Sequence, residues 1–158
     1  MLAFTIVASL VTGCRSWVFP ATSRVAPELV ADLRGTGRVL AATTTEWSWD
    51  GTTDVTDVLV LDVGGSSSRD ALDRALGTLR ARGWKAEGSP DLWRTRLESD
   101  KWDDAYLTVE PLTNYEATKS ERLDEKLDTN NEALLKRLTE QNTRGQLVVL
   151  EARALPDN

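Results

Sequence analysis

A run of four aliphatic residues, Val58 to Leu61, constrains the fold of this 158-residue chain more than any other feature. Successive side chains of a strand point to opposite faces, so the run predicts a central strand, over 54–63, that is buried on both faces. The preceding segment 38–49 (RVLAATTTEWSW) is rich in β-branched and aromatic residues and predicts a second strand. Asp50-Gly51 between them is typical of a tight turn, so the two strands are predicted to form an antiparallel hairpin.

A helix is predicted directly after this hairpin. The apolar residues between Leu72 and Leu79 recur at helical spacing and form a single stripe. Ser67 stands where an N-cap side chain accepts a hydrogen bond from the first turn. Gly83 follows the stripe and is typical of a helix end.

The rest of the chain is predicted to consist of further strands and helices. Further strands are predicted over 84–87, 92–98, 105–112 and 146–155, and a helix over 119–142 with a break at 129–131. The order β-β-α-β-β-α-β predicts one two-layer α+β domain over 38–158, with helices on one face of an antiparallel sheet. The other face is then exposed or covers a ligand. Residues 14–37 are predicted to form a tether and a short helix over 27–34.

The first fourteen residues, MLAFTIVASLVTGC, differ from everything that follows. An uncharged and mostly apolar run from Leu2 to Val11 precedes Cys14, the only Cys in the chain. A helix that spans a bilayer needs about 20 apolar residues, so this run is too short and is typical of a signal-peptide core. The segment Val11-Thr12-Gly13-Cys14 resembles the lipobox of bacterial lipoproteins.

The resemblance to a bacterial lipoprotein implies a modification and a location. Residues 1–13 would be a signal peptide cleaved between Gly13 and Cys14, and Cys14 would carry the lipid. The protein would then be anchored at the extracytoplasmic face of the cell membrane. Residues 1–13 contain no Lys or Arg, although signal peptides normally begin with one. Either the true start lies upstream, or the segment is a buried strand or helix and Cys14 is a core thiol.

A second resemblance covers residues 38–112. The predicted hairpin is followed by a helix that ends in Arg82-Gly83-Trp84 and then by two more strands. This order is similar to small ββαββ domains of actinobacterial lipoproteins of unknown function. The resemblance implies an envelope lipoprotein and no particular activity.

Charge and residue usage exclude several classes of function. The net charge of −6 argues against nucleic acid as a partner, because such binding begins with a basic patch. The chain has no His, which removes Ser-His-Asp and Cys-His catalysis and the usual zinc ligands. No cofactor is predicted. Asp103 and Asp104 are adjacent, so on a strand they point to opposite faces and do not share a substrate.

Tryptophan is unusually frequent, with six residues against two Tyr and two Phe. The sequence predicts a ligand platform made of Trp47, Trp49, Trp93, Trp102 and Arg94. In such a platform, flat indole rings stack on a sugar or an aromatic ligand, and a guanidinium group fixes its orientation. The alternative is that the Trp residues fill the core or cover the open face of the sheet.

Together these observations predict a membrane-tethered, non-catalytic binding or accessory module of the cell envelope. Its partner would be an envelope protein or a cell-wall ligand, contacted through the free face of the sheet. Two alternatives stay open: a carboxylate-dependent hydrolase that acts on glycans, and a purely structural envelope protein. Two carboxylates that converge in a cleft at a separation of roughly 5 to 9 Å would favour the hydrolase.

Overall fold

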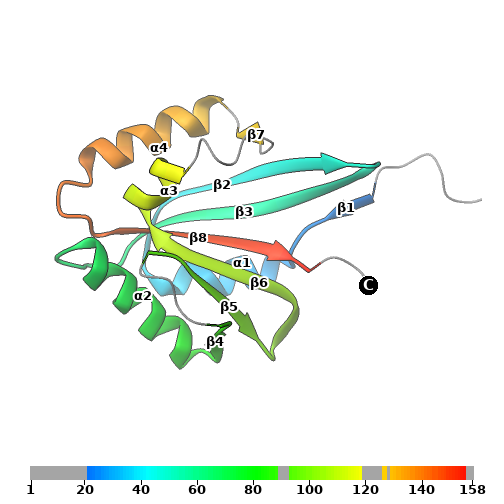
Figure 1. The fold of residues 1–158 in the computed structure, drawn as a ribbon, viewed down its shortest axis with the longest axis horizontal. Helices are drawn as coiled ribbons and strands as arrows, with labels where there is room; N and C mark the ends of the chain where they lie inside the picture. The colour runs from blue at the N-terminus through cyan, green and yellow to red at the C-terminus, as the bar shows by residue number, and fades with distance from the viewer. Residues whose placement is uncertain (1–20, 89–92, 119–125, 128, 156–158) are drawn as a thin grey trace, which may run out of the picture.

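A computed structural model describes residues 21–88, 93–118, 126–127 and 129–155. Gly13 and Cys14 lie outside the described residues, so the signal peptide and the lipid site stay predictions. Within the described ranges, eight strands form one mostly antiparallel sheet, and helices lie on both of its faces (Figure 1). The α+β class predicted from the sequence is confirmed.

The strands are β1 (Ala21–Ser23), β2 (Arg38–Trp49), β3 (Thr52–Asp62), β4 (Trp84–Ala86), β5 (Thr95–Ser99), β6 (Trp102–Pro111), β7 (Lys126–Leu127) and β8 (Leu147–Ala154). The helices are α1 (Pro27–Leu33), the short 3-10 helix η1 (Arg34–Thr36), α2 (Ser68–Ala81), α3 (Leu112–Thr118) and α4 (Thr129–Gln141). The strands lie in the order β4-β5-β6-β8-β3-β2-β7, and β1 pairs in parallel with residues 52–54 of β3. Thus β8, the last strand in the chain, lies between β3 and β6.

β2 and β3 form the predicted hairpin. Asp50 and Gly51 have positive φ angles of 46° and 80°, which is characteristic of the type I′ turn. Gly adopts this region without steric cost, and Asp tolerates it better than most residues. Trp49 pairs with Thr52 across the turn, and the register continues along both strands with one irregularity after Val39.

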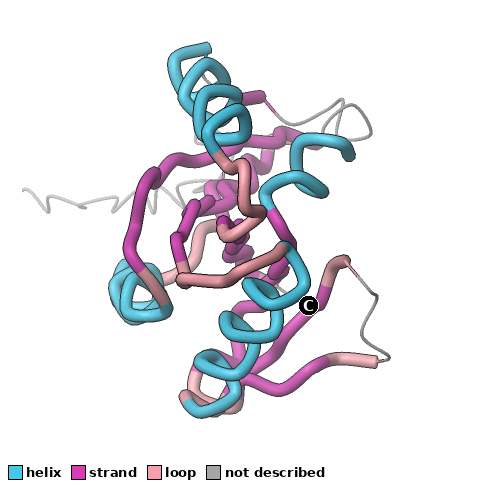
Figure 2. Tube along the Cα trace, turned by 90° about the vertical axis from the view of Figure 1, so that its left-hand side faces the viewer, coloured by secondary structure: helices cyan, strands magenta, loops and turns pink. Residues whose placement is uncertain are grey.

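β3 is buried on both faces, as its aliphatic run predicts. Leu59 and Leu61 pack into one core with α1 and α2, whereas Val58 and Val60 pack into a second core with α3 and α4. All four residues are no more than 2% exposed. The prediction places the helices on one face, whereas the structure has a pair on each face and so three layers (Figures 1 and 2). A strand with apolar side chains on both faces needs cover on both, which accounts for the difference.

α2 begins and ends where the sequence predicts. The backbone N–H of Asp70 donates to the hydroxyl of the N-cap residue Ser67 at 3.2 Å. Gly83, with a φ of 92°, follows the C-cap residue. Trp84 then starts β4 and is buried at 2% exposure on the α1–α2 side of the sheet.

The region after β6 differs from the predicted strand end and long helix. Leu112 and Tyr115 are buried on one side of α3, and residues 112–118 form a helix, whereas the sequence predicts a strand end at 112 and a loop over 113–118. α4 begins at Thr129, inside the predicted break. Leu127, placed in the long helix by the prediction, belongs to β7. The start of the predicted helix, residues 119–125, lies outside the described residues.

Residues 21–37 belong to the packed fold: the short helix predicted over 27–34 corresponds to α1, and residues 21–26, predicted as part of the tether, also contact the domain. β1 extends the sheet beside β3. Val25, Leu29 and Leu33 are each at most 4% exposed and belong to the core formed with α2. α1 therefore packs on the same face of the sheet as α2.

Candidate functional site

One end of the sheet carries polar and aromatic side chains that the described helices leave open. α3 and α4 lie over the end of the sheet away from the β2–β3 turn (Figure 1). Toward the turn, the same side presents five partly or fully exposed residues: Trp47, Trp49, Asp54, Tyr106 and Arg153. Trp47 pairs with Asp54, and Tyr106 pairs with Arg153, across neighbouring strands. We refer to these five residues as the free face.

Trp47 and Trp49 stand two positions apart on β2, on the same side of the strand. Their rings are nearly parallel, with centroids 6.2 Å apart and 12° between the planes. Trp49 is 70% exposed and Trp47 is 37% exposed. Two residues of the predicted platform therefore lie together at the surface.

Trp93 and Trp102 do not join this pair. Trp93 is 49% exposed, but it precedes β5, which β6, β8 and β3 separate from β2. Four strand spacings of about 4.8 Å put these two strands roughly 19 Å apart. Trp102 packs against the core on the α1–α2 side, with the Nζ of Lys101 4.6 Å from its ring centroid. The predicted platform is thus reduced to Trp47 and Trp49.

Arg94, the fifth predicted platform residue, lies over two buried carboxylates. Its Nε is 3.8 Å from Oε1 of Glu110, and its Nη2 is 3.6 Å from Oε2 of Glu151. Both glutamate side chains are at most 1% exposed, whereas Arg94 is 48% exposed. Asn114 donates a hydrogen bond to Glu110, and Nη2 of Arg153 lies 3.5 Å from Oε1 of Glu151. Arg94 therefore balances buried negative charge and does not serve a ligand near Trp47.

A hollow of about 350 Å³ opens on the free face. It is lined by Trp47, Asp54, Tyr106 and Arg153, together with Ser23, Val55, Thr56 and Ala154. The Cζ of Arg96 lies 4.0 Å from the ring centroid of Tyr106 and covers one side of that ring. Two aromatic rings, a carboxylate and a guanidinium thus converge on one space, an arrangement that can stack on a ligand ring and hydrogen-bond its hydroxyl groups.

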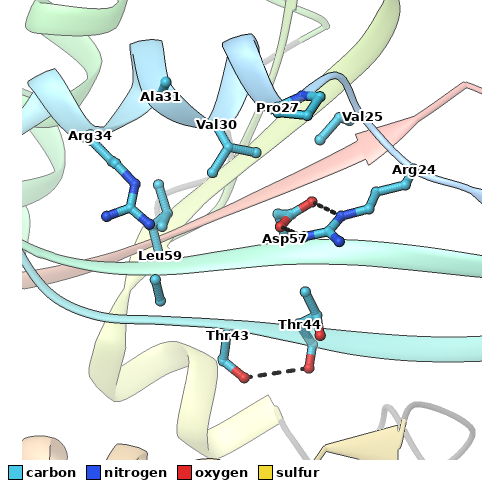
Figure 3. Close-up of a pocket in the computed structure, with 11 residues that line it drawn as sticks. Arg24, Val25, Pro27, Val30, Ala31, Arg34, Thr43, Thr44, Asp57 and Leu59 are labelled. Carbon is cyan, nitrogen blue, oxygen red and sulfur yellow. Dashed lines mark hydrogen bonds and ion pairs between the residues drawn. The ribbon is translucent and has the colours of Figure 1, made fainter.

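A larger pocket of about 720 Å³ lies on the opposite side of the sheet, between α1 and the strands β2 and β3 (Figure 3). Its apolar lining consists of Val25, Pro27, Val30, Ala31, Ala42 and Leu59. Its polar lining consists of Arg24, Arg34, Thr43, Thr44 and Asp57. We refer to this space as the α1 pocket.

A bidentate ion pair closes one part of the α1 pocket. Nε and Nη2 of Arg24 donate to the two carboxylate oxygens of Asp57 at 2.9 and 2.6 Å. This hydrogen bonding raises the pKa of Arg24, as do the charges of Asp57 and Glu46, while burial acts in the opposite direction. Asp57 is only 5% exposed, so the guanidinium of Arg24 is committed to it.

Arg34 is different, although it lines the same pocket. Its side chain extends from the end of α1 into the space above Leu59 (Figure 3). Among the described residues, no carboxylate lies within ion-pair distance of its guanidinium. The α1 pocket thus holds one neutralised guanidinium and one that is available.

The sequence alone signals only part of these two regions. In the strand predicted over 105–112, alternation with the apolar Ala105 and Leu107 predicts that Tyr106 points outward. Its neighbour Arg153 comes from a strand whose pairing the sequence does not reveal. The α1 pocket joins Arg24, α1 and the β2–β3 hairpin, and no local pattern marks such a junction. The sequence therefore does not predict the residues of the α1 pocket.

Two further observations bear on the chemistry available. The described part of the chain contains no group of three or more Asp, Glu, Cys or His side chains placed to hold a metal ion. In the same part, no helix has the length and apolar character needed to cross a membrane. Comparisons with protein-family models, with curated proteins and with solved structures give no match to this chain.

Proposed function

We propose that this protein is a lipid-anchored module of the bacterial cell envelope that binds a cell-wall glycan on its free face without catalysis. One observation carries the binding proposal: Trp47, Tyr106, Asp54 and Arg153 line a single hollow. Sugar rings have apolar faces and polar edges. Aromatic side chains stack on the faces, and charged side chains hydrogen-bond the hydroxyl groups.

The position of β1 supports the anchored arrangement. The backbone N–H of Ala21 donates to the carbonyl of Gly51 at 3.1 Å, so the chain enters the fold beside the β2–β3 turn. Ala21 follows Cys14 by seven positions, and seven residues span at most about 25 Å. A lipid on Cys14 would therefore hold this turn, and Trp49 next to it, close to the outer surface of the membrane.

The hydrolase alternative finds less support in the arrangement of carboxylates. Glu110 and Glu151 approach the same guanidinium, that of Arg94, and so lie near each other. Both are buried, and neither lines the hollow on the free face or the α1 pocket. A glycosidase needs two carboxyl groups on either side of an accessible glycosidic bond.

Binding is tested by calorimetric titration of the protein with soluble disaccharide-peptide fragments of peptidoglycan. Trp47→Ala should weaken binding about tenfold, because it removes a stacking ring from the hollow. Trp93→Ala is the matched control, since it removes an exposed indole that does not line the hollow, and it should leave the affinity within about twofold. An absence of saturable binding, or equal losses in the two variants, would defeat the proposal.

The anchor is tested separately, in cells that express the full chain. Metabolic labelling with a radioactive fatty acid should label the wild-type protein and should not label Cys14→Ser. An unlabelled wild-type protein would contradict the lipid anchor and leave the glycan measurement unaffected.

A further inference from the structure

We propose that the α1 pocket is a second binding site, which takes a monocarboxylate with an apolar body, such as an acyl or aryl acid. The pocket lies on the opposite side of the sheet from the free face. The proposal therefore stands independently of the glycan site.

The first argument is the space and its walls. A volume of about 720 Å³ falls within the range of small-molecule sites, which is roughly 300 to 1,000 Å³. Leu59 of β3 and Val30 of α1 face the space from opposite sides (Figure 3). Six of the eleven lining residues are apolar, so the pocket favours a ligand whose body is apolar.

The second argument is the charge. Arg34 reaches into the pocket without a carboxylate partner among the described residues, beside the apolar side chain of Leu59. A guanidinium group presents a planar fork of donors that matches the geometry of a carboxylate. Attraction between opposite charges is also stronger beside apolar walls than in open water.

The third argument sets the ligand's charge at minus one. Arg24 also lines the pocket, but its Nε and Nη2 donate to the carboxylate of Asp57, which neutralises its charge. A dianion such as a phosphate monoester would find only one available guanidinium and would face the carboxylate of Asp57. A cation would be repelled by Arg34. A single carboxylate matches the single available guanidinium.

The experiment uses the full chain with Cys14→Ser, so that an added acid is not confused with the protein's own acyl groups. Decanoate represents acyl acids, 3-phenylpropanoate represents aryl acids, and decan-1-ol is the uncharged analogue. Binding is followed by isothermal calorimetry at pH 7. At least one of the two acids should bind saturably. The acid that binds more tightly shows whether the site prefers acyl acids or aryl acids.

Two variants separate the roles of charge and space. Arg34→Gln should weaken the binding of the acid about tenfold and leave that of decan-1-ol unchanged. Arg80→Gln is the matched control, because it removes an exposed cation of α2 outside the pocket, and it should change neither affinity. Ala42→Leu, which adds bulk to the pocket wall, should weaken both ligands.

Three results would overturn the proposal. The first is that neither acid binds saturably. The second is that the wild type and Arg34→Gln bind the acid with equal affinity. The third is that Arg34→Gln and Arg80→Gln lose the same amount of affinity for the acid. Unchanged circular dichroism and thermal midpoint of Arg34→Gln would show that its loss of binding is not a loss of fold.

Discussion

The free face and the α1 pocket lie on opposite sides of one sheet, and their arginines are used differently. Next to the free face, Arg94 is half exposed, yet it is held between two buried glutamates. In the α1 pocket, Arg24 is similarly exposed and is held by Asp57, whereas Arg34 has no such partner among the described residues. Exposure alone therefore does not show which cation is available to a ligand.

The difference follows from how each region is built. Arg94 stands just before β5, where its side chain reaches the buried carboxylates of Glu110 on β6 and Glu151 on β8. The α1 pocket lies where a short helix packs against a hairpin, and Arg34 at the end of that helix meets no strand partner.

The largest expected effect is a difference in stability between two matched variants. Arg94→Gln should lower the free energy of unfolding by about 2 kcal/mol, because Glu110 and Glu151 stay buried and lose a shared counter-charge. Arg34→Gln should change it by less than about 0.5 kcal/mol, as is usual for an exposed side chain without such contacts. Urea unfolding followed by circular dichroism measures both. If the two variants lost similar amounts of unfolding free energy, the proposed difference between Arg94 and Arg34 would be wrong.

Much of the hairpin and the central strand follows from local sequence. Asp50-Gly51 has the conformations that a type I′ turn requires, and the run Val58 to Leu61 is buried on both faces as its pattern demands. Ser67 caps α2 because its hydroxyl reaches the backbone of the first turn. These features depend on residues that are neighbours in the chain.

Other features depend on pairings between distant segments. β8 lies between β3 and β6, and this placement brings Arg153 beside Tyr106. No local pattern encodes that choice of neighbours. A β3 buried on both faces requires helices on both faces of the sheet. The alternation of side chains along the strands does not show which helix covers which face. The predicted Trp platform is not assembled because Trp93 precedes β5, which is remote from β2, and Trp102 packs on the other face of the sheet.

A smaller effect concerns a carboxylate outside both regions. Hydrogen bonds from Arg38 and from the backbone N–H of Gly64 lower the pKa of Asp62. A depressed pKa contributes stability above the unfolded value of about 3.9, and this contribution is lost as the pH falls through the folded value. Asp62→Asn should therefore cost about 1 kcal/mol at pH 7 and progressively less below pH 4.

This prediction is checked by urea unfolding of the wild type and Asp62→Asn at several pH values between 7 and 2. Ligand binding at either site should not change in the variant, since Asp62 lines neither of them. A constant difference in stability across this pH range would show that Asp62 does not act through its charge.

The central claim is that the free face, and not the core or the α1 pocket, binds the glycan. Indole N–H signals in a ¹⁵N–¹H correlation spectrum report on this directly, because Trp47 lines the hollow, Trp49 stacks on Trp47, and Trp84 is buried on the other side of the sheet. During titration with a peptidoglycan disaccharide-peptide, the signals of Trp47 and Trp49 should shift and saturate together while that of Trp84 stays in place. A spectrum in which no indole signal moves, or in which Trp93 moves and Trp47 does not, would contradict the account.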